Sequence, residues 1–400
     1  MKIAIRAFSM LNENNISRDI MNHKKISKKI VIFIIFSVVF AGILEILVRQ
    51  YIYNPNRSYI RTPGWQMTVR TNDLLPFATG DHKITINRYG YRGALPTTNA
   101  KPMIAVTGGS TVEDWVFSEP ETWTEQLQSQ LRNCLPSIEV INLGKAGANA
   151  RHNLMQLEAA SKYLPRIDTF IVLLGLNDFL FDLRIHHPIE LPADWWDQQA
   201  FMTRAGEDGP SAVITVLRRA YDRWLSRNST ENLVSDFGQY QQSLIAAYRK
   251  VRAAQWVDEM PDLSEHLATY RTTIKKLKGF ADKREAEIVF VSQPYLWSKK
   301  MSDQAKAQIY AGFIGSDMNN PATKWYTPKA LEAGLASYNQ TLLTVCREDR
   351  LNCIDAARAL PKDATVFYDD FHYSKMGARK LGQIVAQGIL KDGLTSAQGD

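Results

Sequence analysis

Five short apolar runs between residues 103 and 354 each have about the length of one strand. They are rich in Ile, Val and Leu, and such continuous apolar composition is typical of strands buried on both faces of a sheet. The runs are Met103 to Val106, Glu139 to Asn142, Thr169 to Leu174, Ile288 to Val291 and Asn352 to Ile354.

Amphipathic stretches with helical spacing separate these runs. The alternation predicts an α/β fold in which right-handed crossovers join parallel strands and helices cover both faces of the sheet. Ligands of such sheets bind beyond the carboxyl ends of the strands, so polar residues that directly follow the strands are the first candidates for a site. The predicted helices are Glu121 to Arg132, Asn153 to Tyr163, His266 to Lys283, Lys329 to Cys346 and Lys375 to Leu390.

One stretch, Phe179 to Ser264, breaks the alternation. It is too long for an ordinary connection, and it carries helical patterns through Val213 to Leu225 and Phe237 to Val257. We expect a helical insertion over about 180–264 at the carboxyl edge of the sheet. It is either a lid or substrate platform, or a packing element with no part in the site. Trp195, Trp196 and Trp297 are either exposed platforms for sugar rings or buried core residues.

Near the N-terminus, Ile30 to Val48 forms an apolar run interrupted mainly by Ser37 and Glu45. At a rise of about 1.5 Å per residue it spans roughly 28 Å, close to the hydrocarbon thickness of a bilayer. A cluster of four lysines within residues 24–29 lies directly before it, so the positive-inside rule predicts a cytoplasmic basic tail (1–29) and a domain on the far side of the membrane. A buried core helix would have a polar face, and a cleaved signal peptide usually has a shorter apolar run. We therefore predict a retained transmembrane anchor over 30–48.

Residues 49–100 are rich in turn residues, and Lys83 to Asn87 alternates polar and apolar positions, which predicts an extended connector with a short hairpin. The net charge of +7 is concentrated before this segment: residues 1–50 carry +5, which leaves +2 for the other 350 residues. No basic stripe with interleaved aromatic residues follows, so the charge does not indicate a nucleic-acid partner.

Three cysteines are compatible with either redox compartment. Cys346 and Cys353 flank a short polar stretch and either form a disulfide in an oxidising space or remain buried apolar residues. Cys134 has no obvious partner.

Two polar segments stand out as candidate chemistry. Ser110 follows the first predicted strand in a Gly-Gly-Ser-Thr turn, whose small residues expose the hydroxyl and leave the Ser110 N–H free to face an oxyanion. Near the other end, Asp369 precedes His372 by three residues. This pattern is typical of a serine nucleophile whose base is His372, oriented by Asp369, with Asp370 as a rival orienting group.

Two further loops follow the second and third strands. The segment 142–149 contains Gly147, which allows close approach of the backbone and offers an unhindered N–H. The third strand leads to Asn177, whose carboxamide is a neutral hydrogen-bond donor suited to an oxyanion. Each of these features taken singly is also compatible with an ordinary turn or loop cap.

The four segments in this order resemble the SGNH hydrolases, the GDSL esterase/lipase superfamily, over about residues 100–392. The resemblance implies a three-layer α/β/α sandwich with a flavodoxin-like parallel sheet over 101–393, followed by a tail (394–400). It also implies that Ser110, Asp369 and His372 are catalytic, that Ser110, Gly147 and Asn177 form the oxyanion hole, and that no metal or other cofactor takes part.

Two departures from the family pattern are present. Gly109 stands where the name-giving motif has an acid, and Leu176 occupies a position that is often small. The segment from Asn87 to Gly93 also resembles one that precedes the domain in membrane-anchored relatives.

These observations predict an anchored, extracytoplasmic serine esterase whose substrate is an acylated carbohydrate or lipid of the envelope, carrying O-acetyl or another short acyl group. Two alternatives remain. One is an O-acyltransferase of the same fold, and the other is a non-catalytic scaffold that binds glycans or proteins of the envelope.

Overall fold

The computed structural model describes residues 28–52, 58–71, 75, 78–96, 102–162, 164, 166–185, 202–204, 211–228, 234–236, 243, 246, 255–314 and 324–391. The chain forms two compact units, one made of Met1–Arg57 with Ala205–Arg218 and the other of Ser58–Arg204 with Arg219–Asp400. The second unit holds the sheet and all predicted site residues.

The sheet of the second unit has five parallel strands in the order β13-β10-β6-β4-β5. Numbered along the chain, this is the order 2-1-3-4-5 of flavodoxin-like sheets. Every residue of β4 and β6 is buried, in agreement with their continuous apolar composition. The strands are β4 (Met103–Gly108), β5 (Glu139–Asn142), β6 (Thr169–Leu174), β10 (Glu287–Ser292) and β13 (Asn352–Ile354).

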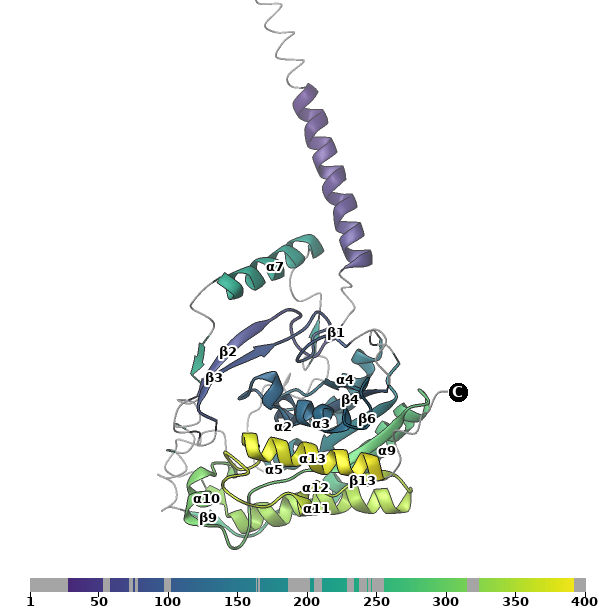
Figure 1. Ribbon diagram of the computed structural model, residues 1–400. Helices are drawn as coiled ribbons and strands as arrows, with labels where there is room; N and C mark the ends of the chain where they lie inside the picture. Colours follow the sequence, from purple (N-terminus) through teal and green to yellow (C-terminus); the bar gives the residue numbers. More distant parts are fainter. Residues whose placement is uncertain are drawn as a thin grey trace, which may run out of the picture. The chain divides into compact units, whose positions relative to one another are not determined.

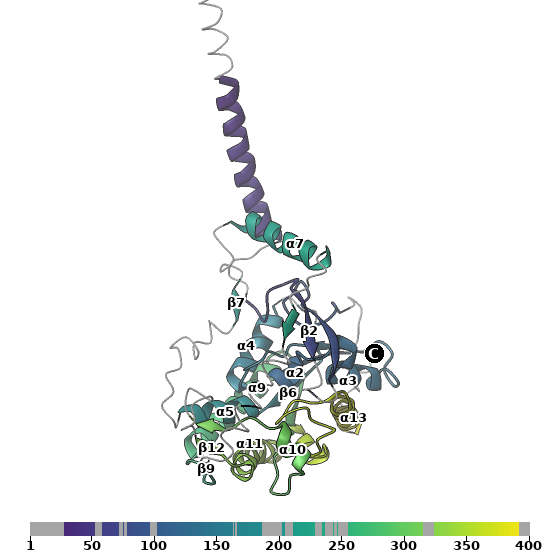
Figure 2. The ribbon, with the colours of Figure 1, turned by 90° about the vertical axis from the view of Figure 1, so that its left-hand side faces the viewer.

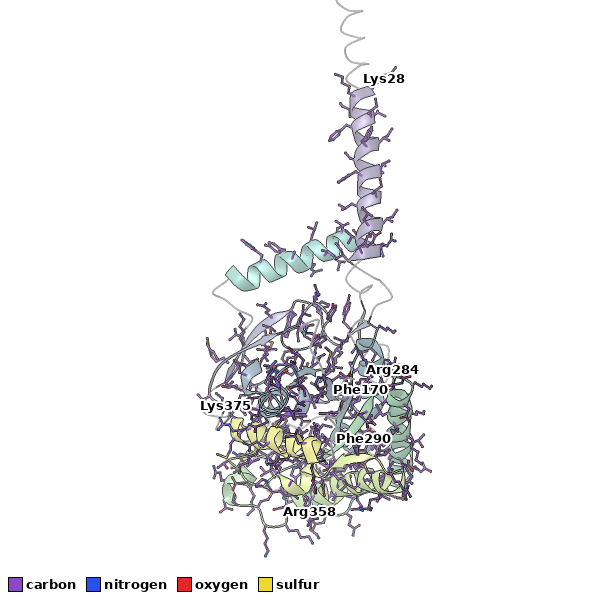
Figure 3. The ribbon with its side chains drawn as sticks, turned by 45° about the vertical axis from the view of Figure 1, so that its right-hand side comes forward. Lys28, Phe170, Arg284, Phe290, Arg358 and Lys375 are labelled. Carbon is purple, nitrogen blue, oxygen red and sulfur yellow. A yellow bond between two sulfur atoms is a disulfide. The ribbon has the colours of Figure 1, made fainter. Side chains whose placement is uncertain are left out.

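Helices cover both faces of this sheet. The crossover from β4 to β5 runs in the opposite direction along the sheet to the later ones, so right-handed connections place α3 on one face and α4, α9 and α11 on the other. The C-terminal helix α13 returns to pack beside α3 (Figures 1 and 2). Phe170 of β6 and Phe290 of β10 lie in the core (Figure 3). The long helices are α3 (Trp123–Leu131), α4 (Ala150–Ala160), α9 (Ser264–Asp282), α11 (Pro328–Glu348) and α13 (Lys375–Lys391).

One helix start differs from its prediction. The helix α4 begins three residues before its predicted start because Asn149 caps it, accepting a hydrogen bond from the His152 N–H at 3.1 Å. The remaining helices of the second unit are α2 (Ser110–Glu113), η1 (Glu119–Glu121), α5 (Leu176–Ile185), α10 (Asp303–Gln308) and α12 (Ala356–Ala359).

The connector before the domain forms a hairpin of β2 and β3, which pair antiparallel. The insertion contributes short strands as well as a helix: β7 pairs with β1, β8 with β2, and β9 with β12, which also pairs with β11. Strands of two or three residues leave no periodic signal in the sequence. The bounds are β1 (Ser58–Tyr59), β2 (Gln66–Thr71), β3 (Gly80–Thr85), β7 (Thr203–Arg204), β8 (Val234–Asp236), β9 (Trp256–Val257), β11 (Phe313–Ile314) and β12 (Lys324–Tyr326).

In the insertion, helix α7 (Ala212–Asn228) covers the first of the two predicted helical patterns. Most of the second pattern, together with Trp195 and Trp196, lies outside the described residues. The predictions of a lid or substrate platform and of the 394–400 tail therefore remain predictions.

The unit that contains the N-terminus includes an apolar helix, Lys28–Tyr51, with a mean hydropathy of 2.9 over its most apolar window. Its side chains project on all sides without a polar face (Figure 3). Within the described part of the chain it is the single helix long and apolar enough to cross a membrane. A signal sequence has the same properties, so the helix fits either form of membrane targeting.

Cys346, near the end of α11, and Cys353, in β13, form a disulfide with a Cα–Cα distance of 6.2 Å. Of the two possibilities that the sequence left open, the structure therefore contains the paired form. Cys134 is free and exposed.

Candidate active site

The turn that carries Ser110 connects β4 directly to α2. A side chain at Gly108 would approach the Leu173 carbonyl oxygen to 2.8 Å, and one at Gly109 would collide with the Asn177 carboxamide. A side chain at position 109 would therefore require the Asn177 carboxamide to move.

His372 lies in the loop before α13 and contacts Ser110 across 262 residues of sequence. Its Nε2 is 2.8 Å from Ser110 Oγ, and its Nδ1 is 2.7 Å from Asp369 Oδ2. Asp369 Oδ1 accepts hydrogen bonds from the backbone N–H groups of Phe371 and His372, which fix the carboxylate in the turn. The three side chains thus form a continuous chain of contacts in which Asp369 can hold the tautomer that leaves Nε2 free to accept a proton.

Asp370, the rival orienting group, contacts other residues. Its Oδ1 accepts from Trp297 Nε1 at 2.6 Å, and its Oδ2 accepts from the N–H groups of Tyr310 and Ala311 at 2.7 and 3.1 Å. Burial, and next the charge of Asp369, raise the pKa of Asp370 to about 7. Trp297 is fully buried, so it cannot stack on a sugar ring, and the core alternative applies to it.

Opposing effects act on the protonation of His372. Burial disfavours the charged imidazolium, but the charge and hydrogen bond of Asp369, and then the charges of Asp114 and Asp370, outweigh it, so the pKa of His372 is raised. Asp114 is itself buried, and burial raises its pKa to about 7 against the opposing charges of Arg92 and His372. Nearby carboxylates thus make His372 a stronger base than an ordinary histidine.

Gly147 lies in the loop after β5, and Asn177 lies in the first turn of α5. The Asn177 Nδ2 donates to the Ala148 carbonyl oxygen at 2.8 Å, which ties the start of α5 to the loop that contains Gly147. Gly147 has a φ of +81° with open space around it, so the conformation itself favours glycine there. The contact between Asn177 and the position of Gly109 places the carboxamide beside the turn that carries Ser110. That Gly147 and Asn177 act as oxyanion donors remains a prediction.

Two supporting residues, Arg61 and Glu113, were not identified by the sequence analysis. The Glu113 carboxylate is buried, with 1% of the side chain exposed. It accepts hydrogen bonds from Arg61 Nε at 2.7 Å and from Arg61 Nη2 at 2.8 Å. It also accepts the Ala146 N–H at 2.6 Å. Glu113 therefore links the helix that begins at Ser110 to the loop of Gly147. Arg61 lies 52 residues upstream in the connector, so no local spacing could have revealed the pair.

A second arginine, Arg92, binds the backbone of the segment that follows Ser110. Its buried guanidinium donates to the backbone carbonyl oxygens of Glu113, Asp114 and Phe117. The Asn142 Nδ2 adds a hydrogen bond to the Val112 carbonyl at 2.7 Å. The sequence drew attention to this segment only through its resemblance to anchored relatives, and the structure supplies a physical reason for the arginine.

Gln293, after β10, connects the segment that follows Ser110 to the loop of His372. Thr111 Oγ1 donates to Gln293 Oε1 at 3.1 Å, and Gln293 Nε2 donates to Tyr373 Oη at 3.0 Å. All three side chains are buried. The loops after β4, β5, β6 and β10 thus converge with the histidine loop at the carboxyl edge of the sheet, as expected for an open α/β sheet.

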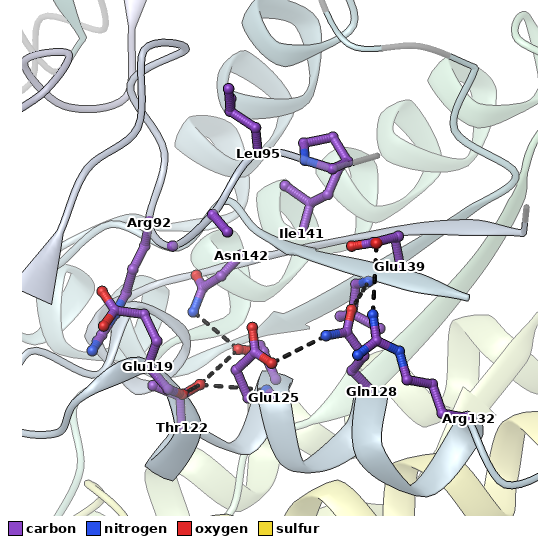
Figure 4. Close-up of a pocket in the computed structure, with 15 residues that line it drawn as sticks. Arg92, Leu95, Glu119, Thr122, Glu125, Gln128, Arg132, Glu139, Ile141 and Asn142 are labelled. Atoms are coloured by element: carbon purple, nitrogen blue, oxygen red, sulfur yellow. Dashed lines mark hydrogen bonds and ion pairs between the residues drawn. The ribbon is translucent and has the colours of Figure 1, made fainter. Parts of the chain in front are cut away.

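A pocket of about 350 Å³ lies between the connector, α3 and β5 (Figure 4). Its walls include Arg92 and Asn142, which hold the nucleophile turn through the backbone bonds described above. Ser110, Asp369 and His372 are not among the residues that line it. The pocket is therefore distinct from the Ser110–His372 contact.

A scan of protein-family models and a search of curated proteins found no match. Among solved structures, the chain is similar to LAE5, an alpha/beta hydrolase enzyme from the metagenome of Lake Arreo, at 11% identity and a TM-score of 0.37, covering 75% of this chain and 98% of that chain. The lipase/acylhydrolase from Enterococcus faecalis is similar at 12% identity and a TM-score of 0.38, and the match covers 73% of this chain and 96% of that chain. The acetylxylan esterase Axe2 from Geobacillus stearothermophilus is similar at 11% identity and a TM-score of 0.36, with 75% of this chain and 96% of that chain covered.

The observed sheet has the flavodoxin-like order that the resemblance implied, and Ser110, Asn177, Asp369 and His372 lie at its carboxyl edge. The strand order agrees with the prediction, and these predicted site residues lie close together at one edge of the sheet.

Proposed function

We propose that this protein is a serine ester hydrolase that uses Ser110 as nucleophile, His372 as general base and acid, and Asp369 as the group that orients His372. One observation carries the proposal: the contacts from Ser110 Oγ to His372 Nε2 and from His372 Nδ1 to Asp369 Oδ2, at 2.8 and 2.7 Å. These are the distances at which a base takes a hydroxyl proton and an orienting group fixes the base.

In the first half-reaction, Ser110 Oγ attacks the ester carbonyl carbon while His372 Nε2 takes its proton. The carbonyl oxygen becomes an oxyanion, for which the N–H groups of Ser110 and Gly147 and the Asn177 carboxamide are the proposed donors. The imidazolium then returns the proton to the alcohol oxygen as the carbon–oxygen bond breaks. The alcohol leaves, and the acyl group remains on Ser110.

In the second half-reaction, water takes the place of the alcohol. His372 removes a proton from the water as its oxygen attacks the acyl carbon, and then returns a proton to Ser110 Oγ as the acid departs. The raised pKa of His372 favours its role as base in both half-reactions, and the negative charge of Asp369 stabilises the transient imidazolium.

For the substrate, we propose O-acetyl or another short acyl group on a carbohydrate or lipid of the cell envelope. This proposal rests on the resemblance of the motifs and on the apolar N-terminal helix, which as a retained anchor with a cytoplasmic N-terminus would hold the hydrolase at the outer face of a membrane. A screen of acetylated glycans against medium-chain esters distinguishes the carbohydrate from the lipid form of the proposal.

Labelling with a fluorophosphonate probe tests the reaction class. The wild-type protein is expected to be labelled and to hydrolyse short p-nitrophenyl esters, whereas Ser110→Ala should lose both properties. His372→Ala should lose turnover by at least about 10³-fold, because the base and acid are the same group. A wild-type protein that folds but takes no label at Ser110 would favour the non-catalytic scaffold instead.

A further inference from the structure

Helix α7 carries an apolar stripe that is open to solvent. Ile214, Leu217, Tyr221 and Trp224 are spaced by three or four residues, so they lie on one face of the helix. Their exposed fractions are 65%, 62%, 57% and 58%. The rings of Tyr221 and Trp224 stack on one another at 6.1 Å. Four large side chains exposed in one row are unusual for a helix that faces water, and mark a surface that binds something.

The first turn of α7 is fixed to the apolar N-terminal helix within the same compact unit. Glu45 accepts hydrogen bonds from the backbone N–H groups of Ala212 and Val213 at 2.7 and 3.1 Å, and from the Ser211 hydroxyl at 2.9 Å. Arg49 donates to the same carboxylate at 2.7 Å. Glu45 thus satisfies N–H groups that every helix leaves without an internal partner at its start.

The buried residues at this junction are on a different face of α7 from the stripe. Ala212 and Thr215 are buried, as is Val48 on the N-terminal helix. Ile214 and Leu217 alternate with them along the helix and remain exposed. Contact with the N-terminal helix therefore leaves the stripe uncovered.

The position of Glu45 defines the depth at which α7 begins. Glu45 lies three residues before Val48, where the predicted anchor ends, and six residues before the end of the helix at Tyr51. At about 1.5 Å per residue these separations are roughly 4.5 and 9 Å. Helices that lie in the membrane interface bury their apolar face about 5–10 Å into the boundary between headgroups and acyl chains. Because the first turn of α7 is bound to Glu45, α7 begins at the level of that boundary.

We propose that α7 is an interfacial helix whose stripe of Ile214, Leu217, Tyr221 and Trp224 is embedded in the outer leaflet of the membrane. The inference rests on the N-terminal helix being retained as an anchor. Tyrosine and tryptophan are the side chains enriched at this level of a bilayer. The sequence of α7 holds four arginines against one aspartate, which suits a surface of anionic headgroups. The protein would then touch the membrane at two places, by a spanning helix and by a helix lying on the surface.

Quenching by nitroxide-labelled lipids tests this proposal in the full-length protein. The protein carries Cys134→Ser, so that one new cysteine at a time can take an environment-sensitive fluorophore, and is reconstituted in vesicles of phosphatidylethanolamine and phosphatidylglycerol. Leu217→Cys reports on the stripe, Ile43→Cys on the N-terminal helix, and Met376→Cys on an exposed position of α13. Ester hydrolysis by each labelled protein shows that it is folded.

The expected result is at least twofold quenching at positions 217 and 43 and little at 376. Quenching at 43 without quenching at 217 overturns the inference while leaving the anchor and the hydrolase intact. A blue-shifted but unquenched fluorophore at 217 also overturns it, because the stripe would then be covered by protein. If neither 217 nor 43 is quenched, the anchor fails and the inference fails with it.

A second variant tests the stripe itself. Replacing its two rings by Tyr221→Asp and Trp224→Asp should reduce quenching at position 217 by at least half, with hydrolysis of soluble esters unchanged. Undiminished quenching would contradict embedding through this face.

Discussion

At the scale of single residues, two neighbouring aspartates have different roles because their hydrogen-bond partners differ. Asp369 faces the imidazole of His372, whereas Asp370 is surrounded by Trp297 and the backbone of Tyr310 and Ala311. Asp-Asp in the sequence does not distinguish them, since either could reach the histidine. The turn that Asp369 closes on the N–H of His372 decides which one does.

Replacing Asp369 by Asn should change both rate and pH dependence. We expect kcat/KM to fall by roughly 10³–10⁴, because an amide no longer stabilises the imidazolium or selects the tautomer. The neutral form of His372 is the base, so activity is lost as the pH falls through its raised pKa. Removing the carboxylate lowers that pKa, so the acid limb of the remaining activity should move to lower pH.

The pH profile of kcat/KM measures this shift. Asp303→Asn is a matched control, because the Asp303 side chain is almost fully exposed and distant from the histidine in sequence. An acid limb that stays in place in Asp369→Asn would show that another group sets the basicity of His372.

In the proposed reaction, Glu113 acts by holding the loop of Gly147 in position. Glu113→Gln should lower kcat by roughly 10- to 100-fold with a smaller change in KM, because the loop of Gly147 loses an anchor and small displacements of oriented groups are costly. It should also lower the free energy of unfolding by roughly 1–3 kcal/mol, since the donors of Arg61 lose a charged acceptor.

Asp81→Asn provides the comparison, because Asp81 pairs with Arg70 on the exposed surface. Steady-state kinetics and chemical denaturation are expected to show little effect there. Equal effects of the two substitutions would mean that Glu113 contributes no more than a surface ion pair.

At the scale of elements, the end of α11 is joined to the edge strand β13 by the disulfide between Cys346 and Cys353. The strand β13 has only three residues, and it leads to the loops before α13 that carry His372. A crosslink at this position limits fraying of the sheet edge in the folded protein and restricts the unfolded chain.

Replacing both cysteines by serine should lower the free energy of unfolding by about 2 kcal/mol, the amount expected for a short closed loop. Denaturation with and without reductant measures the effect: the oxidised wild type should lose the same stability when reduced, whereas the double variant should not respond. A reductant effect in the variant would have to come from something other than this bond.

At the scale of the whole molecule, the connector is part of the folded domain. Arg61 and Arg92 both come from it, and both contact the segment after Ser110. The strands β2 and β3 belong to the same stretch. A segment that the sequence predicted to be an extended connector thus holds the turn that carries Ser110.

Two truncations test whether the folded domain needs the connector. A chain that begins at Ser58 should keep labelling of Ser110 by a fluorophosphonate. A chain that begins at Pro102 should lose labelling and melt about 10 °C lower, because Glu113 would be left as a buried charge without its partner, at a cost of roughly 3–5 kcal/mol. Equal melting temperatures and labelling would show that the domain after residue 101 is self-sufficient.

The sequence determined the elements whose signal is local. The runs of β5, β6 and β13 coincide with the predicted strands. The reason is clearest for β6, because a strand that is buried on both faces is apolar along its whole length. Helix starts were less predictable, as at α4, where a cap at Asn149 sets the boundary. The segments bearing Ser110, Gly147, Asn177 and His372 could be named because each follows a predicted strand or precedes a helix, where open α/β sheets place their sites.

Only the tertiary structure decided which side chains meet. It selected Asp369 over Asp370, joined Cys346 to Cys353, and brought Arg61, Arg92 and Gln293 to the nucleophile turn. It also left one face of α7 exposed beside a helix of membrane length. Periodicity reports which face of an element is apolar, but a contact between residues 61 and 113, or 110 and 372, depends on how distant elements pack. That packing leaves no trace in local spacing.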